Sequence, residues 1–300
     1  MTATPTPTHP TSSTTVRRKK ATARLLALRA AFAVLDRTAP EVGARWALRI
    51  WCTLPATAGR RRDERPRAGT RADVLLPDGG RLAVETWGDD DDAPVYLAHG
   101  WGGWRGQLGA FVDPLVAAGR RVVAFDAPSH GDSSPGGLGP GRSTAVELAD
   151  GLAAVAAVHG NPDAVIAHSL GCAAIALALH DGLPARRLAL IAPSADPIGM
   201  TENLAAMLGY GERTKRRFLD RLEHLAGRPL SDFGLTTLSG TAPPTLIVHD
   251  RDDKEVPYTD GAGLAEAWPT AELVTTEGLG HQRILRDPAV VERLTRFLTV

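Results

Sequence analysis

The sequence has 300 residues, of which 43% are hydrophobic, 23% are charged and 5% are aromatic, a composition typical of a globular chain that buries one sizeable core. Lys and Arg together number 34, and so do Asp and Glu, so the overall charge argues against a nucleic-acid binder. The sequence has no apolar stretch of about 18 residues or more, and we therefore expect no membrane-spanning helix.

The charges are unevenly divided along the chain. Residues 1–71 carry 15 Lys and Arg against 4 Asp and Glu, a net charge of +11, and residues 72–300 carry −11. The two cysteines, Cys52 and Cys172, are too few for a disulfide scaffold and lack the spacing of a zinc or redox site. We therefore expect a cytoplasmic protein that binds neither nucleic acid nor a metal.

The N-terminal part is predicted to have two sections. Residues 1–20 are rich in Thr, Pro and Ser and are predicted to form a disordered tail. Residues 21–71 are predicted to form a basic helical extension and linker, in which Pro40 divides two helices. Two interpretations of the second helix stay open: it packs on the core, or it is a basic amphipathic helix that makes the protein peripheral to a membrane.

From residue 72 onward, strands and helices alternate. A hairpin is predicted around Pro77-Asp78-Gly79-Gly80, between strands Asp73–Leu76 and Leu82–Trp87. Five further apolar runs are separated mostly by helical stretches: Val95–Ala98, Arg121–Phe125, Ala164–Ala167, Leu188–Ile191 and Thr245–Val248. This alternation predicts an α/β fold with a parallel sheet and helices on both faces.

The strand rhythm stops between Pro193 and Pro244. The interval has the apolar spacing of helices, and an insertion of this size predicts a small helical cap at about residues 194–243. We therefore expect one domain over residues 72–300, with the cap inserted in it.

The segment from Ala164 to Ala174 has the pattern of a nucleophile elbow. An apolar run is followed by Ala167-His168-Ser169-Leu170-Gly171 and then by an Ala-rich helix. The turn between strand and helix is so tight that the residues two before and two after the nucleophile must be small, as Ala167 and Gly171 are. Ser169 is therefore the candidate nucleophile.

A glycine-rich turn follows the third strand, in the sequence His99-Gly100-Trp101-Gly102-Gly103. Such a turn can direct a backbone N–H at a developing oxyanion, and we assign this donor to Trp101. The second donor is the N–H of Leu170, at the start of the helix that follows Ser169. Trp104, just beyond the turn, is a candidate substrate-binding residue.

A serine nucleophile needs a base, and His281 is the candidate because it lies in a glycine-containing loop before the C-terminal helix. The base needs a carboxylate partner, and we choose Asp253 from the segment that follows the last apolar run. Asp250, Asp252 and Asp196 stay open as alternatives. Four other histidines at strand ends or in the loops beyond them are expected to orient backbone: His99, His130, His168 and His249.

From about Asp73 to Val300 the chain resembles the α/β-hydrolase superfamily. The segments HGWGG, DAPSHG, AHSLG, HDRDDKEVP and GLGH occur in the order of that family. The resemblance implies an eight-stranded, mostly parallel sheet, a serine-hydrolase triad of Ser169, Asp253 and His281, and a cap after the sixth strand. It also implies that Asp126, in the DAPSHG segment, is structural.

These features predict a carboxylesterase-like serine hydrolase that cleaves an ester-type bond of a small, apolar substrate without a cofactor. The same triad serves thioesterases, lactonases, C–C hydrolases and perhydrolysis, and the fold does not choose among them. A non-catalytic binding module on this fold is a further alternative.

Overall fold

The computed structural model describes residues 12–56 and 66–299. Residues 1–11 of the predicted tail and residues 57–65 of the predicted extension and linker lie outside this description. The contacts divide the chain into two units, one formed by residues up to 51 with residues 199–225, and the other by residues 52–198 with residues 226–300.

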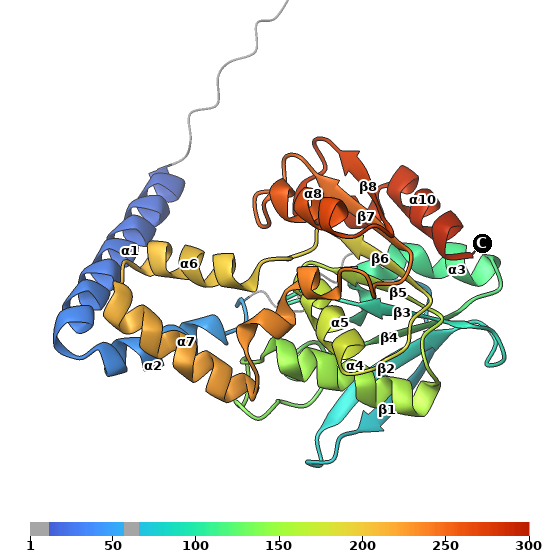
Figure 1. Cartoon of the computed structure of the whole chain (residues 1–300), viewed down its shortest axis with the longest axis horizontal. Helices are drawn as coiled ribbons and strands as arrows, with labels where there is room; N and C mark the ends of the chain where they lie inside the picture. The colour runs from blue at the N-terminus through green and yellow to red at the C-terminus, as the bar shows by residue number, and fades with distance from the viewer. Residues whose placement is uncertain (1–11, 57–65, 300) are drawn as a thin grey trace, which may run out of the picture. The chain divides into compact units, whose positions relative to one another are not determined.

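The second unit contains an eight-stranded sheet in the order β1-β2-β4-β3-β5-β6-β7-β8, within the described residues (Figure 1). β1 and β4 each pair antiparallel with β2, and the remaining neighbours pair in parallel. The predicted mostly parallel sheet is therefore confirmed. The strands are β1 (Thr70–Leu75), β2 (Arg81–Trp87), β3 (Pro94–Ala98), β4 (Arg121–Phe125), β5 (Ala164–His168), β6 (Arg187–Ile191), β7 (Thr245–Asp250) and β8 (Ala271–Thr276).

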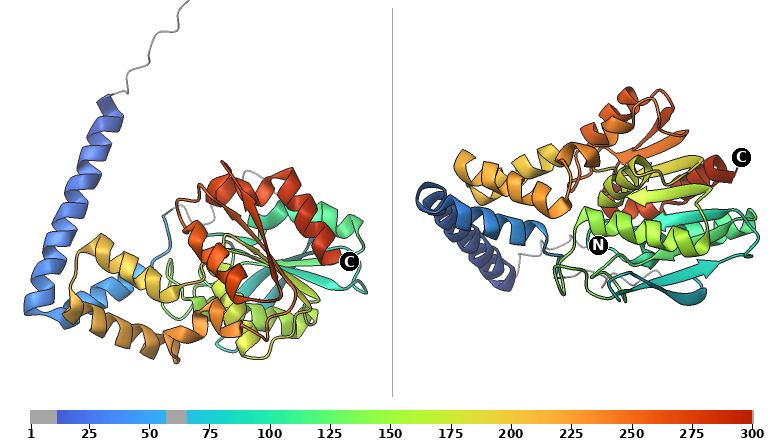
Figure 2. Two further views of the ribbon diagram at one scale, coloured as in Figure 1. Left: turned by 45° about the horizontal axis from the view of Figure 1, so that its top comes forward. Right: turned by 60° about the horizontal axis from the view of Figure 1, so that its bottom comes forward.

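Helices cover both faces of this sheet (Figures 1 and 2). α3 and α10 pack together on one face, and α4 and α5 pack together on the other. The helices of this unit are α3 (Val112–Ala117), α4 (Ala145–His159), α5 (Leu170–His180), α8 (Tyr258–Ala267), α9 (Gly280–Arg283) and α10 (Pro288–Thr299). Short 3-10 turns join them at η1 (Arg105–Phe111), η2 (Leu230–Phe233), η3 (Leu235–Leu238) and η4 (Ile284–Arg286).

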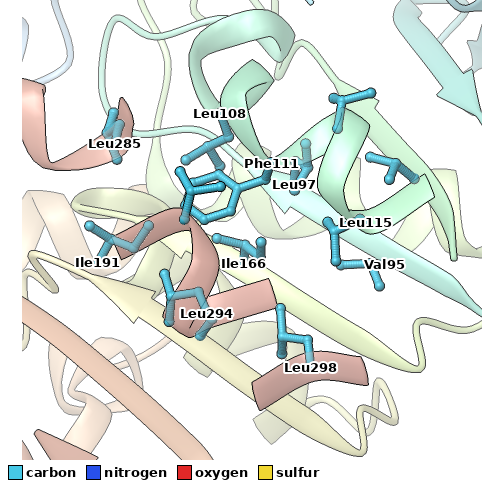
Figure 3. Close-up of a cluster of buried hydrophobic side chains, with 14 of the residues drawn as sticks. Val95, Leu97, Leu108, Phe111, Leu115, Ile166, Ile191, Leu285, Leu294 and Leu298 are labelled. Carbon is cyan, nitrogen blue, oxygen red and sulfur yellow. The ribbon is translucent and has the colours of Figure 1, made fainter. Parts of the chain in front are cut away.

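A core cluster of buried side chains lies between the sheet and the layer of η1, α3 and α10 (Figure 3). Alternate strand residues such as Val95 and Leu97 enter this cluster, because side chains of a strand alternate between the two faces. Every residue of β4 and β5 is buried, whereas only Val74 of the edge strand β1 is. The continuous apolar runs in the sequence are therefore the strands that have helices on both faces.

The first unit contains the helices α1 (Ser12–Thr38), α2 (Pro40–Trp51), α6 (Pro197–Leu208) and α7 (Glu212–Ala226). The unit boundaries at residues 199 and 225 fall just inside the ends of α6 and α7. Aromatic rings join these helices. Phe32 of α1 lies 4.8 Å from Trp46 of α2 and 5.6 Å from Tyr210, between ring centroids. Trp51 meets the fully buried Phe218 of α7 edge-on at 5.9 Å.

The structure corrects the predicted boundaries in two places. α1 begins at Ser12, so residues 12–20 are helical rather than part of the tail. The physical reason is that Ser and Thr are good helix caps, and the segment that follows is rich in Ala, Leu, Arg and Lys with no Gly or Pro before Pro40.

The second correction concerns the cap. α1 and α2 do not form a separate extension, because they share a unit with α6 and α7 of the predicted cap. The rest of that insertion, with η2 and η3, belongs to the unit that holds the sheet. The aromatic contacts between the helices explain this grouping. No helix in the described part of the chain is long and apolar enough to cross a membrane.

Candidate active site

Ser169 lies in the turn between β5 and α5, in a backbone conformation that side chains rarely adopt, with φ of 54° and ψ of −123°. Its N–H donates to the Ile191 carbonyl at 3.0 Å, and its own carbonyl accepts from Cys172 N at 3.0 Å. A non-glycine residue in this region stores strain, which surrounding contacts must hold. The predicted elbow is therefore present as a strained turn at the carboxyl end of a buried strand.

Gly171 is required by the space around this turn. A Cβ atom at this position would lie 2.6 Å from the carbonyl oxygen of His99 and 2.8 Å from that of Ala98, both backbone atoms. Ala167, on the other side of Ser169, is fully buried. The small residues that the sequence places around Ser169 thus allow β3 and the elbow to approach each other closely.

His281 and Asp253 come together from two different segments that follow neighbouring strands. Asp253 follows β7, His281 lies in α9 beyond β8, and Asp253 Oδ2 is 2.7 Å from His281 Nδ1. Asp253 Oδ1 accepts the N–H groups of Glu255 at 2.8 Å and Val256 at 3.0 Å. Burial raises the pKa of Asp253, but hydrogen bonds from His249, His281 and Val256 outweigh it, and this pKa lies well below its ordinary value.

The alternative carboxylates have other partners. Asp250 Oδ2 accepts from Thr276 Oγ1 at 2.7 Å and from Leu279 N at 3.0 Å, and Asp252 Oδ2 accepts from Gly278 N at 3.0 Å. Both therefore hold the loop that leads to His281. Asp196 lies near Asp260, whose pKa is raised by burial and by the Asp196 carboxylate.

His281 also packs against the residue that precedes Ser169. Its ring centroid is 4.5 Å from that of His168, the residue before Ser169. Its other nitrogen, Nε2, is 3.9 Å from Oε2 of Glu255, a side chain that is 57% exposed. His281 thus has one ring nitrogen on a buried carboxylate and the other near a half-exposed one.

The glycine-rich turn after β3 lies against Ser169, because a Cβ atom on Gly100 would be 3.0 Å from Ser169 Cβ. The Gly100 carbonyl accepts from His99 Nδ1 at 2.8 Å and from Gly103 N at 2.9 Å. In a trans peptide the N–H points away from the carbonyl, so the Trp101 N–H is directed away from these two donors. Leu170, the other predicted donor, is the first residue of α5.

The two tryptophans have different surroundings. Trp101 is partly exposed, and its ring meets that of His130 edge-on at 5.7 Å. Trp104 is only 6% exposed; its ring packs over Gly106 and lies 5.9 Å from the guanidinium carbon of Arg105. The assignment of Trp104 to substrate binding stays a prediction.

A buried ionic cluster lies next to the glycine-rich turn. The Arg105 guanidinium is paired with Asp126, contacts Glu85 at 3.1 Å and contacts Asp132 at 2.8 Å. Asp126 also accepts the backbone N–H groups of Arg105 and Asp132. Asp126 therefore has structural contacts, which tie the start of η1 to the loop after β4.

The four histidines expected to orient backbone each contact a backbone group. His99 Nε2 accepts from Ala127 N at 3.1 Å, and His130 Nε2 accepts from Gly102 N at 3.1 Å. His168 Nε2 donates to the His281 carbonyl at 3.1 Å, and His249 Nε2 contacts the Val256 carbonyl at 3.3 Å.

Sequence reasoning assigned no role to Gln107 or Arg105. Gln107 lies in η1 and contacts both Gly100 and His168, and Arg105 forms the centre of the ionic cluster. Neither belongs to a local motif, because their partners are distant in the sequence. Only the approach of β3, β4 and β5 brings these partners together.

The comparisons with known proteins agree on one family. A model described as "Alpha/beta hydrolase family" matches residues 95–294. A non-heme chloroperoxidase of Streptomyces lividans is 26% identical over 274 residues, which cover 73% of this chain and 95% of that protein.

Two solved structures share the fold. A hydrolase from Pseudomonas aeruginosa aligns with a TM-score of 0.60 at 22% identity, over 78% of this chain and all (100%) of the other. A thermophilic esterase from Thermogutta terrifontis aligns with a TM-score of 0.54 at 23% identity, over 76% of this chain and 96% of the other. The elbow, the sheet order and the extent of the family match together show that this chain belongs to the alpha/beta hydrolase family.

Proposed function

We propose that the protein is a serine hydrolase that cleaves an ester-type bond of a small, apolar substrate through an acyl-enzyme. Ser169 is the nucleophile, His281 the general base and Asp253 the carboxylate that fixes its tautomer. The contact of 2.7 Å between Asp253 Oδ2 and His281 Nδ1 is the observation that carries the proposal. This bond leaves Nε2 of His281 to accept a proton.

The reaction has two steps. In the first, His281 Nε2 takes the hydroxyl proton of Ser169 while Oγ attacks the carbonyl carbon, and the N–H groups of Trp101 and Leu170 stabilise the oxyanion. The carbon–oxygen bond to the leaving alcohol then breaks, and His281 gives that alcohol the proton. In the second step, His281 takes a proton from a water that attacks the acyl carbon. The bond from that carbon to Ser169 Oγ then breaks, His281 returns the proton to Oγ, and the acid is released.

Two features support a neutral, apolar substrate. Trp101 offers a partly exposed aromatic ring next to the proposed oxyanion donor. Glu255 places a carboxylate 3.9 Å from His281 Nε2, on the side where the leaving group takes its proton. A negative charge there repels anionic leaving groups.

Replacing the nucleophile tests the proposal. Ser169→Ala removes the attacking oxygen, so hydrolysis of p-nitrophenyl acetate should fall by roughly 10⁴- to 10⁶-fold. A fluorophosphonate probe should label the wild type and not this variant. Ser143→Ala is the matched control, because Ser143 is buried and donates to Glu147 at 2.9 Å, and it should keep both labelling and turnover.

Turnover retained by Ser169→Ala would contradict the proposal. A wild type that neither turns over esters nor takes the label would instead favour the non-catalytic binding module. Where Ser169 is labelled, a panel of acyl esters, thioesters and lactones of increasing chain length identifies the bond that is cleaved.

We also propose that α1 contacts an anionic membrane surface. Residues 12–35 contain six Lys and Arg and no Asp or Glu, and the first acidic residue of the chain is Asp36. On the same helix, Leu25 is 41% exposed and Leu26 62% exposed. Basic charge combined with exposed apolar side chains is the pattern of helices that lie at lipid surfaces.

Vesicle binding tests this contact. The full chain should bind vesicles that contain phosphatidylserine more tightly than vesicles of phosphatidylcholine, and high salt should weaken the binding. Replacing Arg17, Arg18, Lys19 and Lys20 by Gln should weaken it roughly 1,000-fold, at about 1 kcal/mol per charge. The control removes the same number of exposed charges from the other unit, at Arg186, Arg251, Lys254 and Arg293.

Equal binding by the two variants would contradict the membrane contact. So would self-association of the free protein that depends on Leu25 and Leu26, because a second copy would then cover these side chains.

A further inference from the structure

A chain of hydrogen bonds joins the glycine-rich turn to His281. Gly100 N donates to Gln107 Oε1 at 3.3 Å, and Gln107 Nε2 donates to His168 Nδ1 at 3.4 Å. His168 Nε2 then donates to the His281 carbonyl at 3.1 Å. Three segments that are distant in the sequence, the turn after β3, the end of β5 and α9, are thereby linked through two side chains that the proposed reaction does not use.

The direction of each bond follows from the state of His168. A carbonyl can only accept, so His168 Nε2 carries the proton and Nδ1 accepts. His168 is 1% exposed, and burial, with the nearby His281, lowers its pKa from 6.5 to about 3. The ring is therefore neutral at ordinary pH and keeps one tautomer, which suits a fixed connector.

Both ends of this chain of hydrogen bonds lie in glycine-containing segments. α9 has only four residues, and the glycines on either side of Leu279, at φ of 77° and 64°, have conformations that side chains disfavour. Such a short, glycine-flanked segment does not fix the position of His281 by itself. Its carbonyl is held by His168, whose ring also lies against the His281 imidazole at 4.5 Å.

At the other end, Gly100 precedes the peptide that carries the Trp101 N–H. Gln107 holds the Gly100 N–H, and His99 with Gly103 holds the Gly100 carbonyl. Both sides of this glycine are therefore fixed, and one of the three groups that hold it, Gln107, is in turn bonded to His168. The same side chains therefore connect the backbone at His281 to the peptide that carries the Trp101 N–H.

We propose that Gln107 and His168 are positioning residues that hold the base His281 and the oxyanion turn at Gly100 in a fixed relation to Ser169. This inference rests on the proposed serine-hydrolase function. Neither residue touches the substrate; each acts through the backbone that it holds. Precise placement of reacting groups contributes to rate, because a misplacement of about 1 Å costs on the order of 100-fold.

The test uses Gln107→Leu and His168→Leu in the full chain. Each should lower kcat for p-nitrophenyl acetate by roughly 10- to 100-fold and leave KM nearly unchanged, because alignment for reaction is lost and not binding. The rate of inactivation by a fluorophosphonate should fall by the same factor. His168→Gln keeps an N–H donor at the end of the side chain and should recover part of kcat relative to His168→Leu.

Tyr96→Phe is the matched control for the loss of a buried hydrogen bond. The Tyr96 hydroxyl donates to the Gly160 carbonyl at 2.7 Å, at the end of α4. Its loss should lower the melting temperature as much as Gln107→Leu does and leave kcat unchanged. Melting curves show whether each variant is folded at the assay temperature.

The outcomes separate the two claims. Wild-type turnover that depends on Ser169, together with an unchanged kcat in folded Gln107→Leu and His168→Leu, overturns the positioning role alone. Equal losses of kcat in His168→Leu and His168→Gln also contradict it, because the hydrogen bond would then be irrelevant. Equal turnover by wild type and Ser169→Ala contradicts the proposed function itself, and the positioning role with it.

Discussion

At the scale of single residues, three histidines around the site are held neutral. Burial lowers the pKa of His99 to about 4, that of His130 to about 3 and that of His168 to about 3. Each uses one ring nitrogen as a donor and the other as an acceptor, so each tautomer is fixed by its partners. A proton on any of them would remove an acceptor that a neighbouring N–H group needs.

The stability of the protein should therefore fall in acid. Below pH 6.5 the unfolded chain gains a proton at each of these positions, and the native protein does not until about pH 4 for His99 and about pH 3 for the others. The free energy of unfolding should drop by about 1.4 kcal/mol per pH unit for each histidine between these limits. Urea titrations between pH 7.5 and 5 measure this slope.

His130→Asn provides the internal check of this linkage. Loss of its hydrogen bonds lowers the free energy of unfolding at every pH. Because Asn does not titrate, the slope of the free energy of unfolding against pH should also fall by the contribution of one proton, about 1.4 kcal/mol per pH unit. A slope identical to that of the wild type would show that His130 titrates normally in the native protein.

At the scale of elements, the elbow at Ser169 lies close against the end of β3. The approach depends on Gly171, because a side chain there would meet backbone oxygens of Ala98 and His99. Moving the backbone at the end of a buried strand costs more free energy than moving the end of a flexible side chain.

Gly171→Ala should accordingly displace the elbow, lower the free energy of unfolding by about 1–3 kcal/mol and remove most ester turnover. The matched control is Gly263→Ala in α8, an exposed helical position where nothing lies within 4 Å of the added Cβ. It should stabilise the protein by about 0.5–1 kcal/mol and keep its activity. Full activity in Gly171→Ala would mean that the turn adapts without cost to Ser169.

At the scale of the whole molecule, the neutral net charge is the sum of two opposite parts. The basic N-terminal residues belong with α6 and α7 and not with a free arm. Ion pairs across these helices reinforce the aromatic contacts, because Glu41 of α2 is paired with Arg221 of α7 and lies 3.6 Å from Arg217. Removing residues 1–51 would uncover Phe218 and Tyr210, so neutralising α1 is the cleaner way to study its charge.

The sequence by itself determined the sheet and much of the proposed site. Continuous apolar runs such as that of β5 indicate strands covered on both faces, and the small residues around Ser169 report a close approach that excludes bulk. These signals are local, because each strand or turn needs its own residue types wherever its partners lie.

Only the tertiary structure shows that Asp253, and not Asp250 or Asp252, contacts the His281 ring, since these three carboxylates lie within four residues of one another and differ only in what they face. The same holds for Gln107 and His168, which meet across 61 positions of the sequence, and for the grouping of α1 and α2 with α6 and α7. Hydrogen-bond partners and packing faces depend on which strands and helices lie side by side in the folded protein. The residue pattern along one chain carries little information about these long-range contacts.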